Sequence, residues 1–84
     1  MTYTYKPSGV CSRQITIDIN DDETINNIEF LGGCNGNLKG ISALVKGKTM
    51  DEIIAALKGI RCGMKGTSCP DQLAMALEQI KEEF

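Results

Sequence analysis

The chain contains no histidine and no tryptophan in its 84 residues. Histidine is the side chain best suited to proton transfer near neutral pH, and it is a frequent metal ligand. Its absence removes Cys–His and Ser–His nucleophilic pairs and every zinc site that uses an imidazole. The composition therefore argues against a hydrolase.

Aromatic residues and positive charge are also scarce. The chain has two tyrosines, two phenylalanines and a formal net charge of −2, so it lacks the basic surface typical of nucleic-acid binding. The basic residues between Lys39 and Arg61 are interpreted as a solvated helix face rather than a phosphate site. Neither a P-loop nor a G-x-G-x-x-G sequence is present. We expect no nucleic-acid partner and no bound nucleotide.

Long apolar runs are absent as well. No stretch approaches the roughly 20 residues of a membrane span, and the first residues are polar and aromatic rather than typical of a signal peptide. We therefore expect a cytoplasmic protein with no membrane partner. In a reducing cytosol, cysteines are more often metal ligands or redox groups than disulfides. A disulfide framework, which would help so small a domain, stays the weaker alternative.

What the chain does contain is four cysteines, with the spacing C-x22-C-x27-C-x6-C. Cys11, Cys34, Cys62 and Cys69 each lie in a segment that also holds glycine or serine, where the chain is expected to turn. Cysteines that only fill a core would instead fall on the periodic apolar positions. Cys34 precedes one predicted helix and Cys69 begins another, which favours the thiolate form. The pattern predicts sulfur chemistry: a metal, a cluster or a redox pair.

Alternating apolar and polar residues predict three strands in the first part of the chain. Isoleucines alternate with polar residues over residues 13–20, and a similar alternation follows over residues 24–31 after a polar turn. Residues 2–6 add a strand before the turn at Pro7. These segments predict an antiparallel meander.

The apolar period changes to three and four residues after Gly36, which predicts helices. The first carries an apolar stripe from Leu38 to Val45, and the second begins with a capping box at Thr49 and ends near Gly59. The third has Ser68 as its N-cap, and its stripe consists of Leu73, Leu77, Ile80 and Phe84. We therefore predict one α+β domain over residues 1–84, with a small antiparallel three-stranded sheet followed by three helices packed on one face.

Residues 66–71, Gly-Thr-Ser-Cys-Pro-Asp, carry the signature after which the TSCPD domain family is named. Residues 33–38 and 59–63 also resemble the small stand-alone members of that family. Related domains occur at the C-terminus of adenosylcobalamin-dependent ribonucleotide reductases. This resemblance implies association with such an enzyme, while cobalamin and catalysis would stay with the larger protein, for which this chain has no room.

A more distant resemblance concerns iron–sulfur scaffold proteins of the IscU and NifU N-terminal type. Residues 30–34 and 41–52 are similar to the turn in which a glycine-cysteine pair opens a helix that ends in a lysine-glycine-lysine-threonine step. The resemblance implies an IscU-like fold and three ligands for zinc or a nascent cluster, at Cys11, Cys34 and Cys69. The family's aspartate after the first cysteine is missing here, and Ser68 replaces its histidine. Cys62 could supply a fourth ligand.

The leading hypothesis is a metal- or cluster-binding module that is not catalytic alone. Cys11, Cys34, Cys62 and Cys69 would form a tetrahedral thiolate site, with zinc if the site is structural and an iron–sulfur cluster if it is functional. One rival is a thiol or persulfide carrier in which Cys62 and Cys69 form a redox pair. The other is an accessory domain of a ribonucleotide reductase. Sulfur-transfer proteins and a second copy in a homodimer complete the partner hypotheses.

Overall fold

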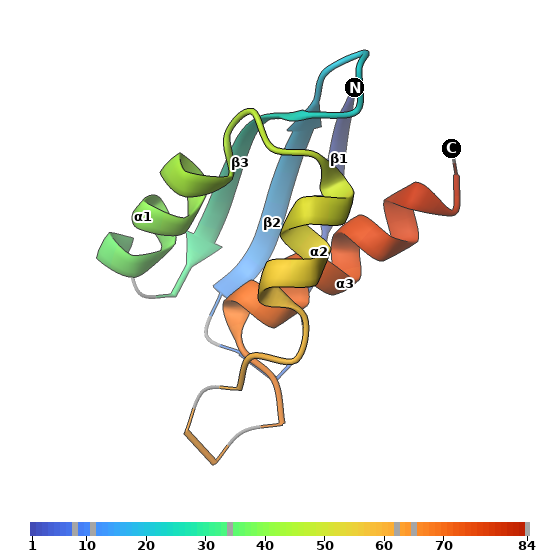
Figure 1. Cartoon of the computed structure of the whole chain (residues 1–84). Helices are drawn as coiled ribbons and strands as arrows, with labels where there is room; N and C mark the ends of the chain where they lie inside the picture. The colour runs from blue at the N-terminus through green and yellow to red at the C-terminus, as the bar shows by residue number, and fades with distance from the viewer. Residues whose placement is uncertain (8, 11, 34, 62, 65, 84) are drawn as a thin grey trace.

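The computed structural model describes all residues except 8, 11, 34, 62, 65 and 84. Three strands come first, β1 (Thr2–Tyr5), β2 (Ser12–Ile19) and β3 (Ile25–Gly32). Three helices follow, α1 (Asn35–Val45), α2 (Met50–Leu57) and α3 (Cys69–Lys81). Figure 1 shows α2 and α3 in front of the sheet and α1 beside β3.

The strands form one antiparallel sheet in the order β1-β2-β3. Ile17 of β2 lies opposite Tyr3 of β1 and Ile28 of β3, so the three side chains share one face. That face is buried, because the isoleucines at positions 15, 17, 19, 25 and 28 are at most 2% exposed. Alternation over β2 therefore reports a half-buried strand, as predicted.

The helices cover the apolar face of the sheet and complete the core. The predicted capping box of α2 is present, since the Thr49 hydroxyl accepts from the Glu52 N–H at 3.2 Å and the Glu52 carboxylate accepts from the Thr49 N–H at 3.0 Å. On their solvent side α2 and α3 are joined by ion pairs Lys58–Glu78 and Lys81–Asp51. The helical contribution to the core consists of Val45, Met50, Ile53, Leu73, Ala76, Leu77 and Ile80.

The predicted α+β fold is confirmed, with small differences at the ends of elements. β2 begins at Ser12 rather than at residue 13, and α3 ends at Lys81. Phe84, which was assigned to the stripe of the third helix, lies outside the described residues. Among the residues that the structure describes, no helix is both long and apolar enough to span a membrane.

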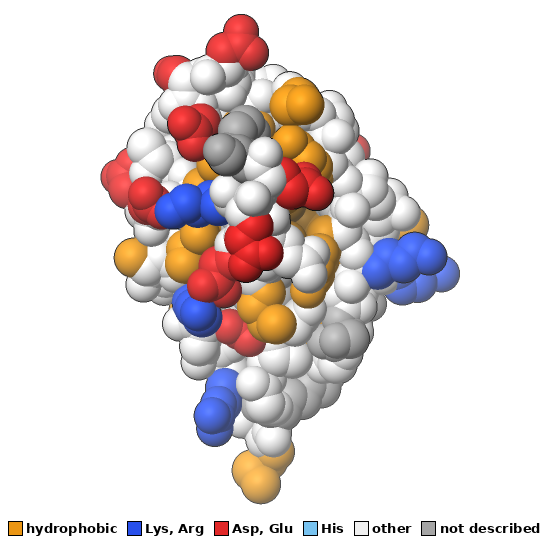
Figure 2. Space-filling model, turned by 90° about the vertical axis from the view of Figure 1, so that its right-hand side faces the viewer, with side chains coloured by type: hydrophobic (Ala, Val, Ile, Leu, Met, Phe, Trp, Pro, Cys, Tyr) orange, Lys and Arg blue, Asp and Glu red, His pale blue; other side chains and the backbone are white. Residues whose placement is uncertain are grey.

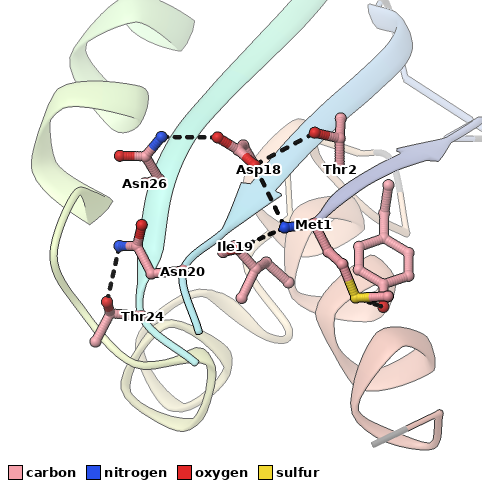
Figure 3. Close-up of polar contacts among 8 residues, drawn as sticks. Met1, Thr2, Asp18, Ile19, Asn20, Thr24 and Asn26 are labelled. Carbon is pink, nitrogen blue, oxygen red and sulfur yellow. Dashed lines mark hydrogen bonds and ion pairs between the residues drawn. The ribbon is translucent and has the colours of Figure 1, made fainter. Parts of the chain in front are cut away.

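A polar network joins the strands at the end of the sheet where the chain begins (Figure 3). Asp18 accepts hydrogen bonds from Asn26 Nδ2 at 2.7 Å and from Thr2 Oγ1 at 3.3 Å. The N-terminal amine donates to the Ile19 carbonyl at 2.9 Å and lies 3.8 Å from Asp18. The hydrogen bond from Asn26 is the main cause that lowers the pKa of Asp18. This network is exposed and links β1, β2 and β3.

Candidate functional site

A cleft of about 520 Å³ lies at the opposite end of the sheet, between α1, residues 60–61 and the start of α3. Its wall is mostly apolar, with Ile41 and Leu44 from α1 and Pro70 from α3 among the lining side chains. The Leu44 side chain is 72% exposed, so the cleft opens to solvent. Cys69 lines this cleft together with Ser68 and Arg61.

Ser68 fixes the start of α3 against the chain that leaves α2. Its hydroxyl accepts from the Asp71 N–H at 3.2 Å, which is the predicted N-cap, and donates to the Ile60 carbonyl at 2.6 Å. One side chain therefore satisfies a free N–H of the helix and anchors the beginning of the connecting loop.

Asp71 also connects the two ends of the loop between α2 and α3. This residue is 8% exposed, and its carboxylate accepts from the Gly59 N–H at 2.6 Å and from the Thr67 hydroxyl at 2.5 Å. The hydrogen bond from Thr67, followed by that from Gly59, lowers the pKa of Asp71 below its usual value. Thr67 in turn accepts from Gln72 Nε2 at 3.0 Å. We call these contacts of residues 67, 68 and 71 the loop clamp.

Cys69 lies against the start of β2. Its Sγ is 3.1 Å from the Ser12 hydroxyl, and the two residues are 8% and 2% exposed. Ser12 faces inward because a β-bulge between Ser12 and Gln14 interrupts the pairing with β3. In a regular ladder that kept Arg13 as a paired residue, Ser12 would instead share the exposed face of Gln14 and Thr16.

Of the four predicted ligands, only Cys69 belongs to the described part of the chain; Cys11, Cys34 and Cys62 lie outside it. Among the described residues, no group of three or more Cys, Asp or Glu side chains is arranged to hold a metal ion. The predicted four-cysteine site therefore stays a prediction.

The described neighbours of the other three cysteines nevertheless meet Cys69 or its cleft. Ser12, which follows Cys11 in sequence, contacts the Cys69 sulfur, and a Cβ atom on Gly9 would lie 3.3 Å from Thr67 Cγ2. Gly36, two positions after Cys34, and Arg61, immediately before Cys62, both line the cleft that contains Cys69. Segments far apart in the sequence thus converge at one end of the sheet, the lower end in Figure 1.

The comparisons with known proteins identify the family. The sequence model described as the TSCPD domain matches residues 1–81. The chain belongs to the TSCPD domain family. No curated protein and no solved structure matches the chain. The family predicted from residues 66–71 is confirmed, whereas the resemblance to iron–sulfur scaffold proteins finds no match and stays a prediction.

The electrostatics of the cleft in this TSCPD domain favour negative charge. Gly36 and Asn37 come from the first turn of α1, which has no acidic residue; Pro70 comes from the first turn of α3, where the Asp71 carboxylate is engaged by Gly59 and Thr67. A helix N-terminus carries about half a positive charge, and two such ends together with Arg61 line one cleft. The arrangement suits thiolates, or an anionic centre made from them.

Sequence reasoning missed two of these contacts. The inward position of Ser12 depends on the bulge, and the alternation pattern gives no signal for an extra residue in a strand. Asp71 lies in the first turn of α3, where a carboxylate interacts favourably with the helix dipole, and it also accepts from the Gly59 N–H, twelve positions earlier in the chain. The hydrogen bond from Thr67 to Asp71 did have a sequence signal, because these two residues flank the predicted cap, whereas the bond from Gly59 had none.

Proposed function

We propose that this TSCPD domain binds a metal ion or an iron–sulfur cluster through Cys11, Cys34, Cys62 and Cys69, and that it is not catalytic alone. The observation that carries the proposal is the contact of Cys69 with Ser12 at the edge of a cleft that Gly36 and Arg61 also line. These described residues are sequence neighbours of the remaining three cysteines. Convergence of four such segments is what a site shared by four ligands requires.

The chemistry of the donors and of their surroundings supports the proposal. Four thiolates suit tetrahedral zinc, and they also suit the common iron–sulfur clusters. Four thiolates around a zinc ion leave two net negative charges, which the two helix N-termini and Arg61 would offset. Because four ligands leave zinc no open position, activation of water at the metal is not expected.

The test is the metal and sulfide content of protein purified without oxygen. We expect about one zinc ion, or iron accompanied by acid-labile sulfide, for each chain, and a large loss in the Cys34→Ala variant. Leu44→Ala is the matched control, because it removes an exposed cleft side chain but no thiol. Protein that holds neither metal nor sulfide, with all four thiols free to react, would contradict the proposal.

A thiol or persulfide carrier is the second candidate, and the loop clamp is the observation that favours it. The clamp ties residues 59 and 60 to residues 68 and 71, and this closed loop contains Cys62 and ends at Cys69. A redox pair predicts one fast-reacting thiol and a reversible disulfide in metal-free protein. Metal ligands predict slow labelling of all four thiols until a chelator is added, so one labelling experiment separates the candidates.

The partner proposal follows from family membership alone. A ribonucleotide reductase that depends on adenosylcobalamin, or a sulfur-transfer protein, is the proposed partner in the cytoplasm. Cobalamin would then belong to the larger enzyme. Co-purification with a tagged copy of this TSCPD domain tests the proposal, and a homodimer in sedimentation would point to a second copy instead.

A further inference from the structure

The outer edge of β3 has backbone groups that no strand of the sheet uses. Ile19 exchanges hydrogen bonds with Met1, at 2.8 and 2.9 Å, so the odd-numbered residues of β2 bond to β1. The even-numbered residues therefore bond to β3, where Thr16 lies opposite Glu29. By the same alternation, the N–H and C=O groups of Ile28 and Phe30 point away from β2, toward the edge of the sheet.

The chain itself pairs with the first part of this edge. The Ile25 N–H donates to the Lys48 carbonyl at 2.9 Å, and the Gly47 N–H donates to the Ile25 carbonyl at 2.8 Å. An antiparallel bridge between Thr24 and Thr49 continues this contact. The pairing ends there, and no comparable bond reaches Ile28 within the described part of the chain. Residues 47–49 therefore already pair with the start of β3, but this pairing ends before Ile28.

A groove of about 410 Å³ lies beside the unused part of the edge, between β3 and α1. This volume falls within the roughly 300–1,000 Å³ of ligand sites. Four consecutive residues of β3, at positions 27–30, line the groove, although their side chains alternate between the two faces of the sheet. The strand therefore presents its backbone edge to the groove. The facing wall comes from Lys39 and Ser42 of α1 and from Lys46, the residue after this helix.

The charge of the groove selects among partners. Lys39 and Lys46 are exposed, and neither forms an ion pair with a residue that the structure describes. Helix α1 contains no acidic residue. Glu29 is the single acidic residue of the lining and comes from the strand. Carboxylates instead gather on the α3 side of the molecule, which Figure 2 shows. The groove therefore has a basic wall that faces the edge N–H and C=O groups of Ile28 and Phe30 in β3, which are unpaired among the described residues.

We propose that this groove binds an extended acidic peptide segment of a partner protein. The segment pairs with Ile28 and Phe30 as a fourth strand, and its carboxylates face Lys39 and Lys46. Strand addition of this kind obtains affinity from main-chain hydrogen bonds and specificity from side chains. A second copy fits less well, because edge-to-edge pairing would bring the lysines of two α1 helices together. The inference does not depend on the cysteine site.

The test uses a fluorescein-labelled heptapeptide that alternates glutamate and valine, added to the protein as isolated, at low salt. Anisotropy should saturate, and the amide signals of Ile28 and Phe30 should shift in NMR spectra. The double variant Lys39→Glu and Lys46→Glu should weaken binding at least about tenfold, because like charges then face each other. Lys6→Glu is the matched control, an exposed charge reversal just after β1.

Several outcomes would overturn the proposal. Equal binding of a peptide that alternates lysine and valine would remove the charge argument. Equal binding of a glutamate peptide N-methylated along one edge would remove strand pairing. Absence of binding at millimolar peptide would exclude an acidic peptide as the occupant. The same conclusion would follow if the free protein formed a dimer whose dissociation constant changed in the Lys39→Glu variant.

Discussion

The two ends of the sheet carry networks of the same chemistry in different surroundings. At each end an aspartate accepts hydrogen bonds from a threonine hydroxyl and from an N–H group. Asp71 in the loop clamp is 8% exposed, whereas the Asp18 side chain at the opposite end is 37% exposed. Asp71 also holds a loop whose described residues take part in no strand pairing, while Asp18 joins strands that a ladder already holds.

The difference teaches where polar contacts determine structure. The hydrogen bonds to Asp71 are partly shielded from water, so a donor that loses this acceptor is only partly compensated by solvent, and the loss costs part of the desolvation penalty. An exposed donor exchanges one partner for another at little cost. We therefore expect the conformation of the described residues between 59 and 68 to depend on the clamp, and the stability of the sheet to change little when the network around Asp18 is removed.

Removal of Asp71 should have the largest effect. In Asp71→Ala the Gly59 N–H and the Thr67 hydroxyl lose their acceptor, and we expect the free energy of unfolding to fall by roughly 1–3 kcal/mol. Urea denaturation measures the change. Asp18→Ala is the matched control and should leave the midpoint nearly unchanged; equal losses at the two positions would break the comparison.

Removal of the Ser68 hydroxyl should follow in size. Ser68→Ala loses an N-cap and the bond to the Ile60 carbonyl, and we expect a cost of about 1–2 kcal/mol. Labelling of Cys69 by a maleimide should also become faster in metal-free protein, because Cys69 is 8% exposed and directly follows Ser68 at the turn of α3 that this cap fixes. Thr49→Ala removes the exposed cap of α2 and should leave the labelling rate unchanged. Faster labelling in both variants would mean that general destabilisation, not the clamp, controls access.

A fall in pH should remove the contribution of the Asp71 carboxylate to stability, and we expect a smaller effect than that of either substitution above. The folded-state pKa of Asp71 is lowered from 3.8, first by the hydrogen bond from Thr67. Its contribution to stability is therefore fully present above the unfolded pKa and is lost as the pH falls through the lower folded pKa. The difference in urea midpoint between the wild type and Asp71→Asn should be constant well above pH 4 and should shrink as the pH falls below the unfolded pKa of about 3.9. A difference that stays constant as the pH falls would contradict the claim that hydrogen bonds to the ionised Asp71 carboxylate stabilise the fold.

The smallest effect is expected for Asn26, which donates to Asp18 at 2.7 Å on the exposed face. Asn26→Ala should change the free energy of unfolding by no more than about 0.5 kcal/mol, as is usual for surface positions. Thermal unfolding at low salt would detect a larger change. Such a result would mean that the exposed network also specifies the fold.

The sequence predicted the fold well where one local pattern determined one element. The alternation of Ile15, Ile17 and Ile19 predicted β2, and the caps at Thr49 and Ser68 correctly marked the starts of α2 and α3. These signals are short-range, because backbone period and capping are properties of neighbouring residues.

The site was less accessible to the same reasoning. The contact of Asp71 with Gly59 depends on how α2 and α3 pack, and the contact of Ser12 with Cys69 depends on a bulge and on the docking of α3 against β2. Neither is a property of a local pattern. Three of the four predicted ligands lie outside the described residues, so for them the prediction stays as the sequence made it.

The bulge at the start of β2 lets the chain change length at position 13 without turning Ser12. Arg13 is the extra residue, so its deletion would restore a regular ladder in which Ser12 still lies opposite Gly32 and still faces the protein interior. Replacing Arg13 by another residue would keep the bulge. Mutational scans of this segment should therefore tolerate both many substitutions at position 13 and its loss, a signature by which the bulge could be recognised in sequences without a structure.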